Sequence, residues 1–238
     1  QLEITGVTAS NLVNCSNFTV VTSMPLNIAA GATGILELSF LINGGGNFSF
    51  DLDIENNDVD RNPYDISVTG NGILPEIDVQ RPAGTSIADG GADNLGNQNA
   101  GTVNLTYTID NTAGTAQLDV IGVTVSNMIN CSNFSVVTSL PLNIAAGATA
   151  QLQVSFNVDD ASAFSFDMDI VNNDGDENLY DILVAGTGVA PEIDIQRPAG
   201  TSIADGGTGN TGNQNTGTVS LTYTIDNTAG TAQLDVIG

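Results

Sequence analysis

The sequence repeats itself with a period of 116 residues. The segment Gln-Leu-Asp-Val-Ile-Gly at residues 117–122 recurs identically at residues 233–238 and in related form at residues 1–6. A period of this length corresponds to a whole small domain rather than to one turn of a solenoid. A unit of that size can bury a hydrophobic core of its own. The chain is therefore expected to be a window on a tandem array of similar domains.

Two Pro-Glu-Ile-Asp segments mark where a domain begins. They start at Pro75 and Pro191, and each follows a Gly-rich stretch. Proline has no N–H group to donate to a central sheet and suits the first residue of a strand. We therefore predict that residues 1–74 are the C-terminal part of one repeat, residues 75–190 a complete repeat, and residues 191–238 the N-terminal part of the next. Half a sandwich leaves backbone groups and an apolar face uncovered, so both parts are expected to be completed by continuation of the chain or by a neighbouring copy.

Hydrophobic side chains in the complete repeat alternate with polar ones. The period is two rather than 3.6, which is typical of strands and not of helices. The predicted strands span residues 76–80, 103–109, 117–125, 134–137, 151–157, 163–170 and 179–184. The predicted core contains Leu105, Tyr107, Phe156, Phe164 and Phe166. Short strands separated by turns predict an all-β fold built as an antiparallel β-sandwich.

Residues 89–101 are rich in Gly and Asn and are predicted to form an exposed loop. Residues 75–122 and 191–238 differ at six positions, and five of these lie between Ala92 and Asn104. The exchanges, such as Asp93 for Gly209, do not conserve side-chain chemistry, which is typical of a loop.

The charge balance is strongly acidic. The chain has 27 acidic residues against three Arg, with no Lys and no His, for a net charge of −24. Nucleic acid and anionic membrane surfaces would be repelled, so neither is an expected partner. The sequence has no apolar run of about 18 residues, so membrane insertion is not expected either. The acids either keep the protein dispersed or collect divalent cations.

The composition disfavours an enzyme. Without His or Lys, the common general bases near neutral pH are missing, and Ser-His or Cys-His pairs cannot be built. A pair of carboxylates could support glycoside hydrolysis in principle. The chain has no Trp to form a platform for a sugar. We therefore expect no catalytic residues.

An acidic hairpin in the complete repeat is the best metal candidate. Its candidate ligands are Asp167, Asp169, Asp174 and Asp176, with first-copy equivalents Asp51, Asp53, Asp58 and Asp60. Ca²⁺ takes six to eight oxygen ligands, and this segment offers enough of them. The spacing does not match an EF-hand loop. The alternative is a solvated turn whose acids deter pairing at a sheet edge.

Each repeat has one cysteine, at Cys15 and Cys131, so a disulfide within one repeat is excluded. Both are flanked by Asn and Ser, which predicts a position near the surface. A thiol there could join neighbouring domains or chains in an oxidising compartment. The alternative is an isolated buried thiol, since cysteine is often buried.

Several segments resemble choice-of-anchor D repeats, which occur in large bacterial surface and secreted proteins. They are the opening Pro-Glu-Ile-Asp-Val at residue 75, Tyr-Thr-Ile-Asp-Asn at 107–111, Leu-Asn-Ile-Ala-Ala-Gly at 142–147, and Asn-Asn-Asp at 172–174, which leads to Tyr180 and a closing Gly-Thr-Gly. The resemblance covers the whole chain. It implies an immunoglobulin-like fold related to Hydin and major-sperm-protein domains, an extracellular or cell-surface location, and no catalytic residues. The cysteine is not part of the resemblance.

Two functions follow as hypotheses. The first is a structural repeat unit of an extracellular filament or cell-surface stalk, whose main partner is another copy of itself. The second is an adhesin or a carbohydrate-binding surface module. An exposed aromatic cluster outside the core would favour the second, and the strand pattern predicts none.

Overall fold

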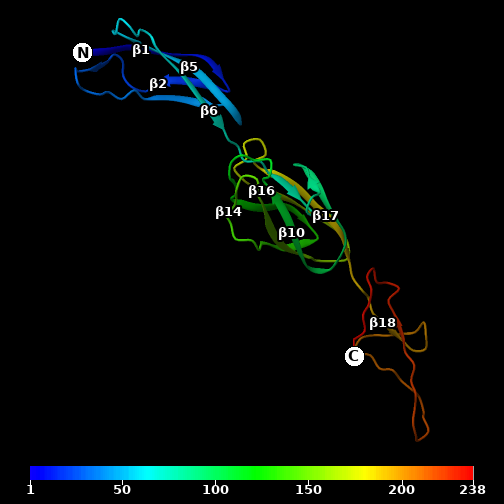
Figure 1. Cartoon of the computed structure of the whole chain (residues 1–238). Coiled ribbons are helices and arrows are strands. Elements are labelled where there is room, and N and C mark those ends of the chain that lie inside the picture. The colour runs from blue at the N-terminus through cyan, green and yellow to red at the C-terminus, as the bar shows by residue number, and fades with distance from the viewer. Residues whose placement is uncertain (238) are drawn as a thin grey trace. The chain divides into compact units, whose positions relative to one another are not determined.

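The computed structural model describes residues 1–237, which form strands, turns and loops without any helix (Figure 1). The described chain separates into two compact units. The first contains residues 1–76, 111–118 and 145–147, and the second contains the other residues. Each unit is described by itself below.

The first unit contains a four-stranded sheet and a two-stranded sheet, both antiparallel. The larger sheet has the order β3 (Leu26–Ile28), β1 (Leu2–Val13), β5 (Gly46–Asn56) and β6 (Tyr64–Gly72). The smaller sheet pairs β2 (Cys15–Val20) with β4 (Leu38–Ile42). Apolar side chains pack between them, with the Phe50 ring 5.0 Å from that of Phe40 and 5.8 Å from that of Phe18.

The second unit contains two larger sheets. One has the order β13 (Cys131–Val136), β15 (Thr149–Val158), β10 (Gly101–Asp110), β7 (Asp78–Gln80) and β8 (Ser86–Ile87). The other has the order β12 (Gly122–Ile129), β16 (Ala163–Val171), β17 (Tyr180–Val189) and β9 (Gly91–Asn99). A short pair joins β11 (Leu118–Val120) to β14 (Leu142–Ile144). The fold is all-β and consistent with a β-sandwich.

The core of the second unit lies between its two larger sheets. The Phe156 ring of β15 packs edge-on at 4.9 Å against the Phe166 ring of β16, so the sheets meet face to face. The alternation in the sequence sets this face, because every second side chain of a strand points the same way. The predicted core is confirmed: Leu105, Tyr107, Phe156, Phe164 and Phe166 are all buried.

Residues 89–101 are mostly exposed, as predicted, but the predicted loop is wrong over most of this length. Residues 91–99 form β9, which runs parallel to β17 with Ile182 opposite Gly91. Because Gly and Asn are disfavoured in strands, the composition hides this element. The sheets are therefore antiparallel except at this one pair, among the strands described.

The predicted strand at residues 117–125 is divided into β11 and β12, since Ile121 lies between them.

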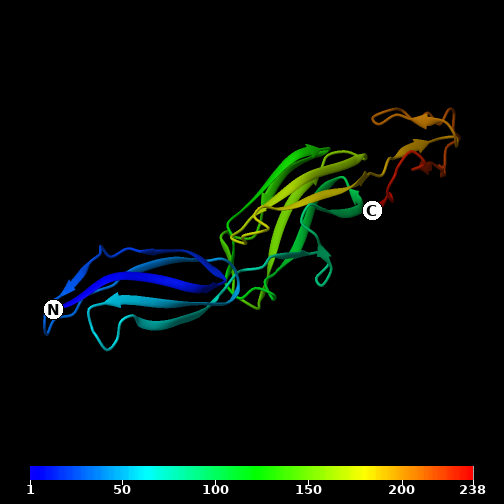
Figure 2. The same cartoon turned by 90° about the horizontal axis from the view of Figure 1, so that it is seen from above.

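Residues 191–237 contain only three short strands, drawn in orange and red in Figure 2. They are β18 (Asp194–Gln196), β19 (Ser202–Ile203) and β20 (Thr224–Asp226), in the order β19-β18-β20. Four apolar side chains of this segment are 43–50% exposed: Val219, Leu221, Tyr223 and Ile225. Their counterparts 116 positions earlier are Val103, Leu105, Tyr107 and Ile109, and all four are buried.

Candidate functional site

The predicted calcium ligands lie in two different places. Asp167 and Asp169 are on the outer face of β16, where they alternate with the buried Phe166, Met168 and Ile170. Asp169 is directly opposite Asp181 of β17. The first unit repeats this arrangement, with Asp53 of β5 opposite Asp65 of β6. The outer faces of both sheets thus hold pairs of like charges across neighbouring strands, a destabilising arrangement when both are ionised.

These carboxyl pairs bind a proton more tightly than isolated carboxyls do. A hydrogen bond with Asp169, with smaller effects from desolvation and nearby acids, raises the pKa of Asp181 to about 6. A hydrogen bond with Asp65 likewise raises the pKa of Asp53 above its ordinary value. Two carboxyls that share one proton avoid the repulsion of two adjacent negative charges.

The raised pKa values predict higher stability in mild acid. A folded-state pKa above the unfolded one means that the native protein binds more protons, so its stability is greatest below pH 4 for this group and falls as the pH rises through about 6. We expect the melting temperature to be higher at pH 5 than at pH 7.5. At pH 7.5, Asp181→Asn should raise the free energy of unfolding by under about 1 kcal/mol, since the pair is exposed. Asp60→Asn, which removes the same charge from a turn, serves as the control, and an equal effect would contradict the role of the pair.

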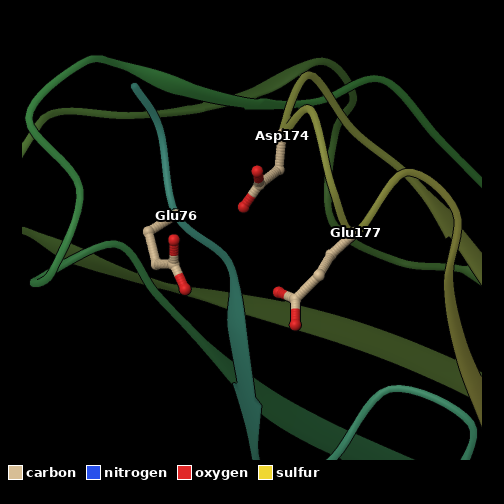
Figure 3. Close-up of side chains that lie close together, drawn as sticks. All are labelled: Glu76, Asp174 and Glu177. Carbon is tan, nitrogen blue, oxygen red and sulfur yellow. The ribbon is translucent and has the colours of Figure 1, made fainter. Parts of the chain in front are cut away.

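The other predicted ligands lie in the loop between β16 and β17. Figure 3 shows Asp174 and Glu177 of this loop, together with Glu76. Asp174 is only 3% exposed, and one of its carboxylate oxygens accepts the Ile77 N–H at 2.9 Å. Burial is the main cause that raises the pKa of Asp174. Asp176 is exposed. Asp174 therefore has a structural task that the sequence did not reveal, which is to hold the start of the second unit.

The calcium hypothesis remains a prediction. In the first copy the equivalent turn is organised by one of its own carboxylates, since Asp58 accepts the Asp60 N–H at 3.1 Å. A bound Ca²⁺ would stabilise only the folded state, so a chelator would lower the melting temperature beyond the effect of salt. An unchanged melting temperature would leave these acids as a solvated face and a structural turn.

Both cysteines are buried, so the predicted surface position is wrong. Cys15 is 6% exposed and Cys131 is 7% exposed, and both are free thiols. Asparagines in the left-handed conformation flank each thiol: Asn130 and Asn133 beside Cys131 have φ values of 50° and 53°, and Asn14 and Asn17 beside Cys15 have the same values. The Cys131 thiol donates to the Ser165 carbonyl of β16, in the other sheet, at 3.4 Å. The Asn130 side-chain amide donates to the Asp160 and Ser162 carbonyls at 2.9 and 3.1 Å, which fixes the residue before Cys131.

The burial predicts slow chemistry at the thiols. Desolvation is the main cause that raises the pKa of Cys131, which lowers the thiolate fraction at neutral pH. We expect both thiols to react with iodoacetamide at least 100-fold faster in guanidinium than in buffer, as followed by intact mass. Non-reducing gels test the cross-link, which is still a prediction. Fast alkylation of the native protein would contradict the burial.

An ion pair that the sequence analysis missed lies inside the second unit. Arg81, just after β7, contacts the Asp93 carboxylate of β9 through two nitrogens, and its Nη2 is 2.6 Å from Oδ1. The Tyr107 hydroxyl of β10 donates to the same carboxylate at 2.9 Å. Asp93 is 6% exposed and Tyr107 is fully buried. This group joins the two larger sheets, since β9 and β10 belong to different ones.

A second missed feature fixes the segment before β7. Within the first unit, the Asn111 side-chain oxygen accepts the Glu76 N–H at 3.0 Å, and the Thr115 hydroxyl accepts the Leu74 N–H at 3.0 Å. The Thr115 N–H in turn donates to the Leu74 carbonyl at 2.7 Å. We call Asn111 and Thr115 the linker clamp. Nothing in the sequence pattern predicts these hydrogen bonds.

The linker clamp recurs 116 positions later. The Asn227 side-chain oxygen accepts the Glu192 N–H at 2.8 Å, and the Thr231 hydroxyl accepts the Ala190 N–H at 3.0 Å. The repeat in the sequence is thus accompanied by a repeat in the hydrogen bonds that hold the two linkers.

No helix in residues 1–237 has the length and hydrophobicity needed to cross a membrane.

No protein-family model matches the sequence, and no curated protein matches it. Among solved structures, the chain is similar to the secreted serine protease VesC from Vibrio cholerae, with 14% identity and a TM-score of 0.35, over 42% of this chain and 22% of that one. It is also similar to a protein of unknown function from Porphyromonas gingivalis W83, with 15% identity and a TM-score of 0.36, over 78% of this chain and 84% of that one. Similarity at this level carries no functional conclusion, and the chain spans about a fifth of the protease.

Proposed function

We propose that this chain is a structural repeat unit of an extracellular filament or cell-surface stalk. In this proposal it consists of tandem immunoglobulin-like β-sandwiches that assemble head to tail. The observation that carries the proposal is the linker clamp, which recurs with the sequence period of 116 residues. The same hydrogen bonds thus recur where one repeat passes into the next, as expected of an array of equivalent units.

The exposed aromatic residues favour a structural unit over a carbohydrate-binding module. Tyr64 is 48% exposed and Tyr223 is 43% exposed, but their counterparts Tyr180 and Tyr107 are buried in the second unit. These side chains therefore belong to sandwich cores and do not form a separate platform for a sugar. The extracellular location rests on the resemblance to surface and secreted proteins described above.

Electron microscopy of the purified protein and of the material from its natural source tests the proposal. We expect unbranched fibres or stalks with a regular axial repeat, and immunogold labelling of the intact cell surface. Separate compact particles with no axial order, or labelling confined to the cell interior, would overturn it.

A further inference from the structure

The complete repeat shows how this fold binds a carboxylate in its interior. The Arg81 guanidinium contacts the Asp93 carboxylate through two nitrogens, and the Tyr107 hydroxyl donates to the same carboxylate. The guanidinium also lies over the Tyr107 ring. We call the guanidinium and the tyrosine side chain the arginine–tyrosine pair. In the complete repeat this pair is satisfied by a side chain of the protein itself.

The chain repeats the arginine–tyrosine pair 116 positions later without the carboxylate. Arg197 and Tyr223 take the places of Arg81 and Tyr107, whereas glycine stands at residue 209, the counterpart of Asp93. The Arg197 guanidinium keeps its position over the tyrosine ring, 5.6 Å from the ring centre. Asp93 and Tyr107 both lie within residues 81–107, so residues 197–223 hold the whole counterpart of this group.

The side chain of Arg197 is short of an acceptor. Its Nη1 atom is buried and has no hydrogen-bond partner among residues 1–237, and no carboxylate of these residues forms an ion pair with it. A buried charge without a counter-charge is costly. An arginine cannot lower this cost by releasing its proton, because its pKa is too high. A carboxylate from solution would lower it.

The position of the missing carboxylate has room for a ligand. A Cβ atom built on Gly209 would lie 3.4 Å from the Tyr223 hydroxyl oxygen, so the absent side chain would start beside this donor. Arg197 and Gly209 line a cavity of about 370 Å³, and Thr201 and Thr208 add hydroxyl groups to its wall. One water molecule takes about 30 Å³, so the cavity can hold a carboxylate and several waters.

We propose that Arg197, Tyr223 and the space left by Gly209 form a binding site for a small carboxylate, such as formate or acetate. The ligand takes the place that the Asp93 carboxylate has in the complete repeat, and accepts hydrogen bonds from the guanidinium and from the tyrosine hydroxyl. The two parallel N–H groups of an arginine match the two oxygens of a carboxylate, whereas chloride has no such pair of acceptors. Successive repeats of one chain then differ in what they bind, which goes beyond a purely structural role.

NMR of the arginine side chains tests the site in the full 238-residue protein, because the chain has only three arginines, Arg61, Arg81 and Arg197. Their Nε–H signals are assigned with single Arg→Lys variants and followed at pH 6 while formate replaces chloride at constant ionic strength. We expect only the Arg197 signal to shift and saturate, with a Kd of about 1 to 50 mM, as the size of the ligand allows. The Arg81 signal should stay in place, because Asp93 already fills that site. Exposed Arg61 reports unspecific binding.

Three variants separate the site from a general effect of charge. Gly209→Asp supplies an internal carboxylate, so it should abolish the response to formate and move the Arg197 signal toward that of Arg81. The fold should accept this change, because the added Cβ meets only ordinary contacts and the glycine is not left-handed. Thr216→Asp adds the same charge at an exposed position and should bind formate like the wild type. Tyr223→Phe removes one hydrogen bond and should weaken binding by about 3- to 10-fold.

Two results would overturn the site. An Arg197 signal that shifts equally in chloride, or only together with Arg61, would indicate an adventitious ion only. An Arg197 signal that matches Arg81 before formate is added would mean that a carboxylate of the chain already occupies the position. The filament proposal does not depend on this ligand and would stand in both cases.

Discussion

Replacing Asp93 by alanine is expected to cost the second unit about 3 kcal/mol of unfolding free energy. The change leaves the Arg81 guanidinium without its carboxylate and the buried Tyr107 hydroxyl without its acceptor. Burial and the Asp93 charge together hold the pKa of Tyr107 far above its ordinary value, so the tyrosine is a neutral donor at any moderate pH. Deleting one partner of a buried pair is costly because the other charge remains desolvated.

Hydrogen exchange followed by mass spectrometry measures this effect locally. Peptides from β9 and β10 should lose protection in Asp93→Ala, while peptides from β1 and β5 of the first unit serve as the internal control. Tyr107→Phe removes only one hydrogen bond and should cost about 1 kcal/mol. Equal protection in Asp93→Ala and the wild type would show that the pair contributes nothing to stability.

The later copy of this site, in residues 191–237, lacks the carboxylate. Residue 209, which corresponds to Asp93, is glycine. In that copy the Nη1 atom of Arg197 is buried without a hydrogen-bond partner. The guanidinium still lies over the Tyr223 ring, 5.6 Å from its centre, as Arg81 lies 6.0 Å from the centre of Tyr107. The exchange of Asp93 for Gly209, which was predicted to be loop variation, therefore removes the carboxylate partner of the arginine.

Sequence periodicity was sufficient where side-chain hydrophobicity decides the structure. The alternation around Phe156 and Phe166 predicts which face of each strand is buried, because burial of apolar area is the main driving force. It failed for β9, whose residues are mostly Gly, Asn and Gln. That strand is held by backbone pairing with β17 and by one buried charge, and neither leaves a hydrophobic pattern.

The candidate site residues were harder to place for a related reason. Spacing along a strand shows that Asp167 and Asp169 share a face, but it does not show that Asp181 lies across from them. Likewise, polar neighbours suggested an exposed Cys131, whereas the thiol is buried and donates to the Ser165 carbonyl of β16. Cross-strand neighbours and backbone turns arise from the tertiary fold, so composition alone could not give them.

Adding one methyl group at Gly114 is expected to open the linker clamp. A Cβ atom there would lie 1.7 Å from the Asn111 side-chain oxygen and 2.9 Å from the Glu76 backbone nitrogen. Asn111 cannot simply turn aside, because its side-chain nitrogen donates to the Ala116 and Ala145 carbonyls at 2.9 and 3.1 Å. Asn111 is fully buried, so any movement leaves polar groups unsatisfied away from water.

We therefore expect Gly114→Ala to cost about 3 kcal/mol or more, combining a steric clash with at least one lost buried hydrogen bond. Gly175→Ala is the matched control, since a Cβ atom there has no neighbour within 4 Å and its backbone is not left-handed. Asn111→Asp keeps the acceptor for Glu76 but places a buried carboxylate against the Ala116 and Ala145 carbonyls, so it should cost at least as much as Gly114→Ala. Hydrogen exchange at the Glu76 amide and thermal unfolding give the readouts. Equal stability of the Gly114→Ala and Gly175→Ala variants would mean that the clamp can rearrange without cost. The clamp would then no longer support the filament proposal.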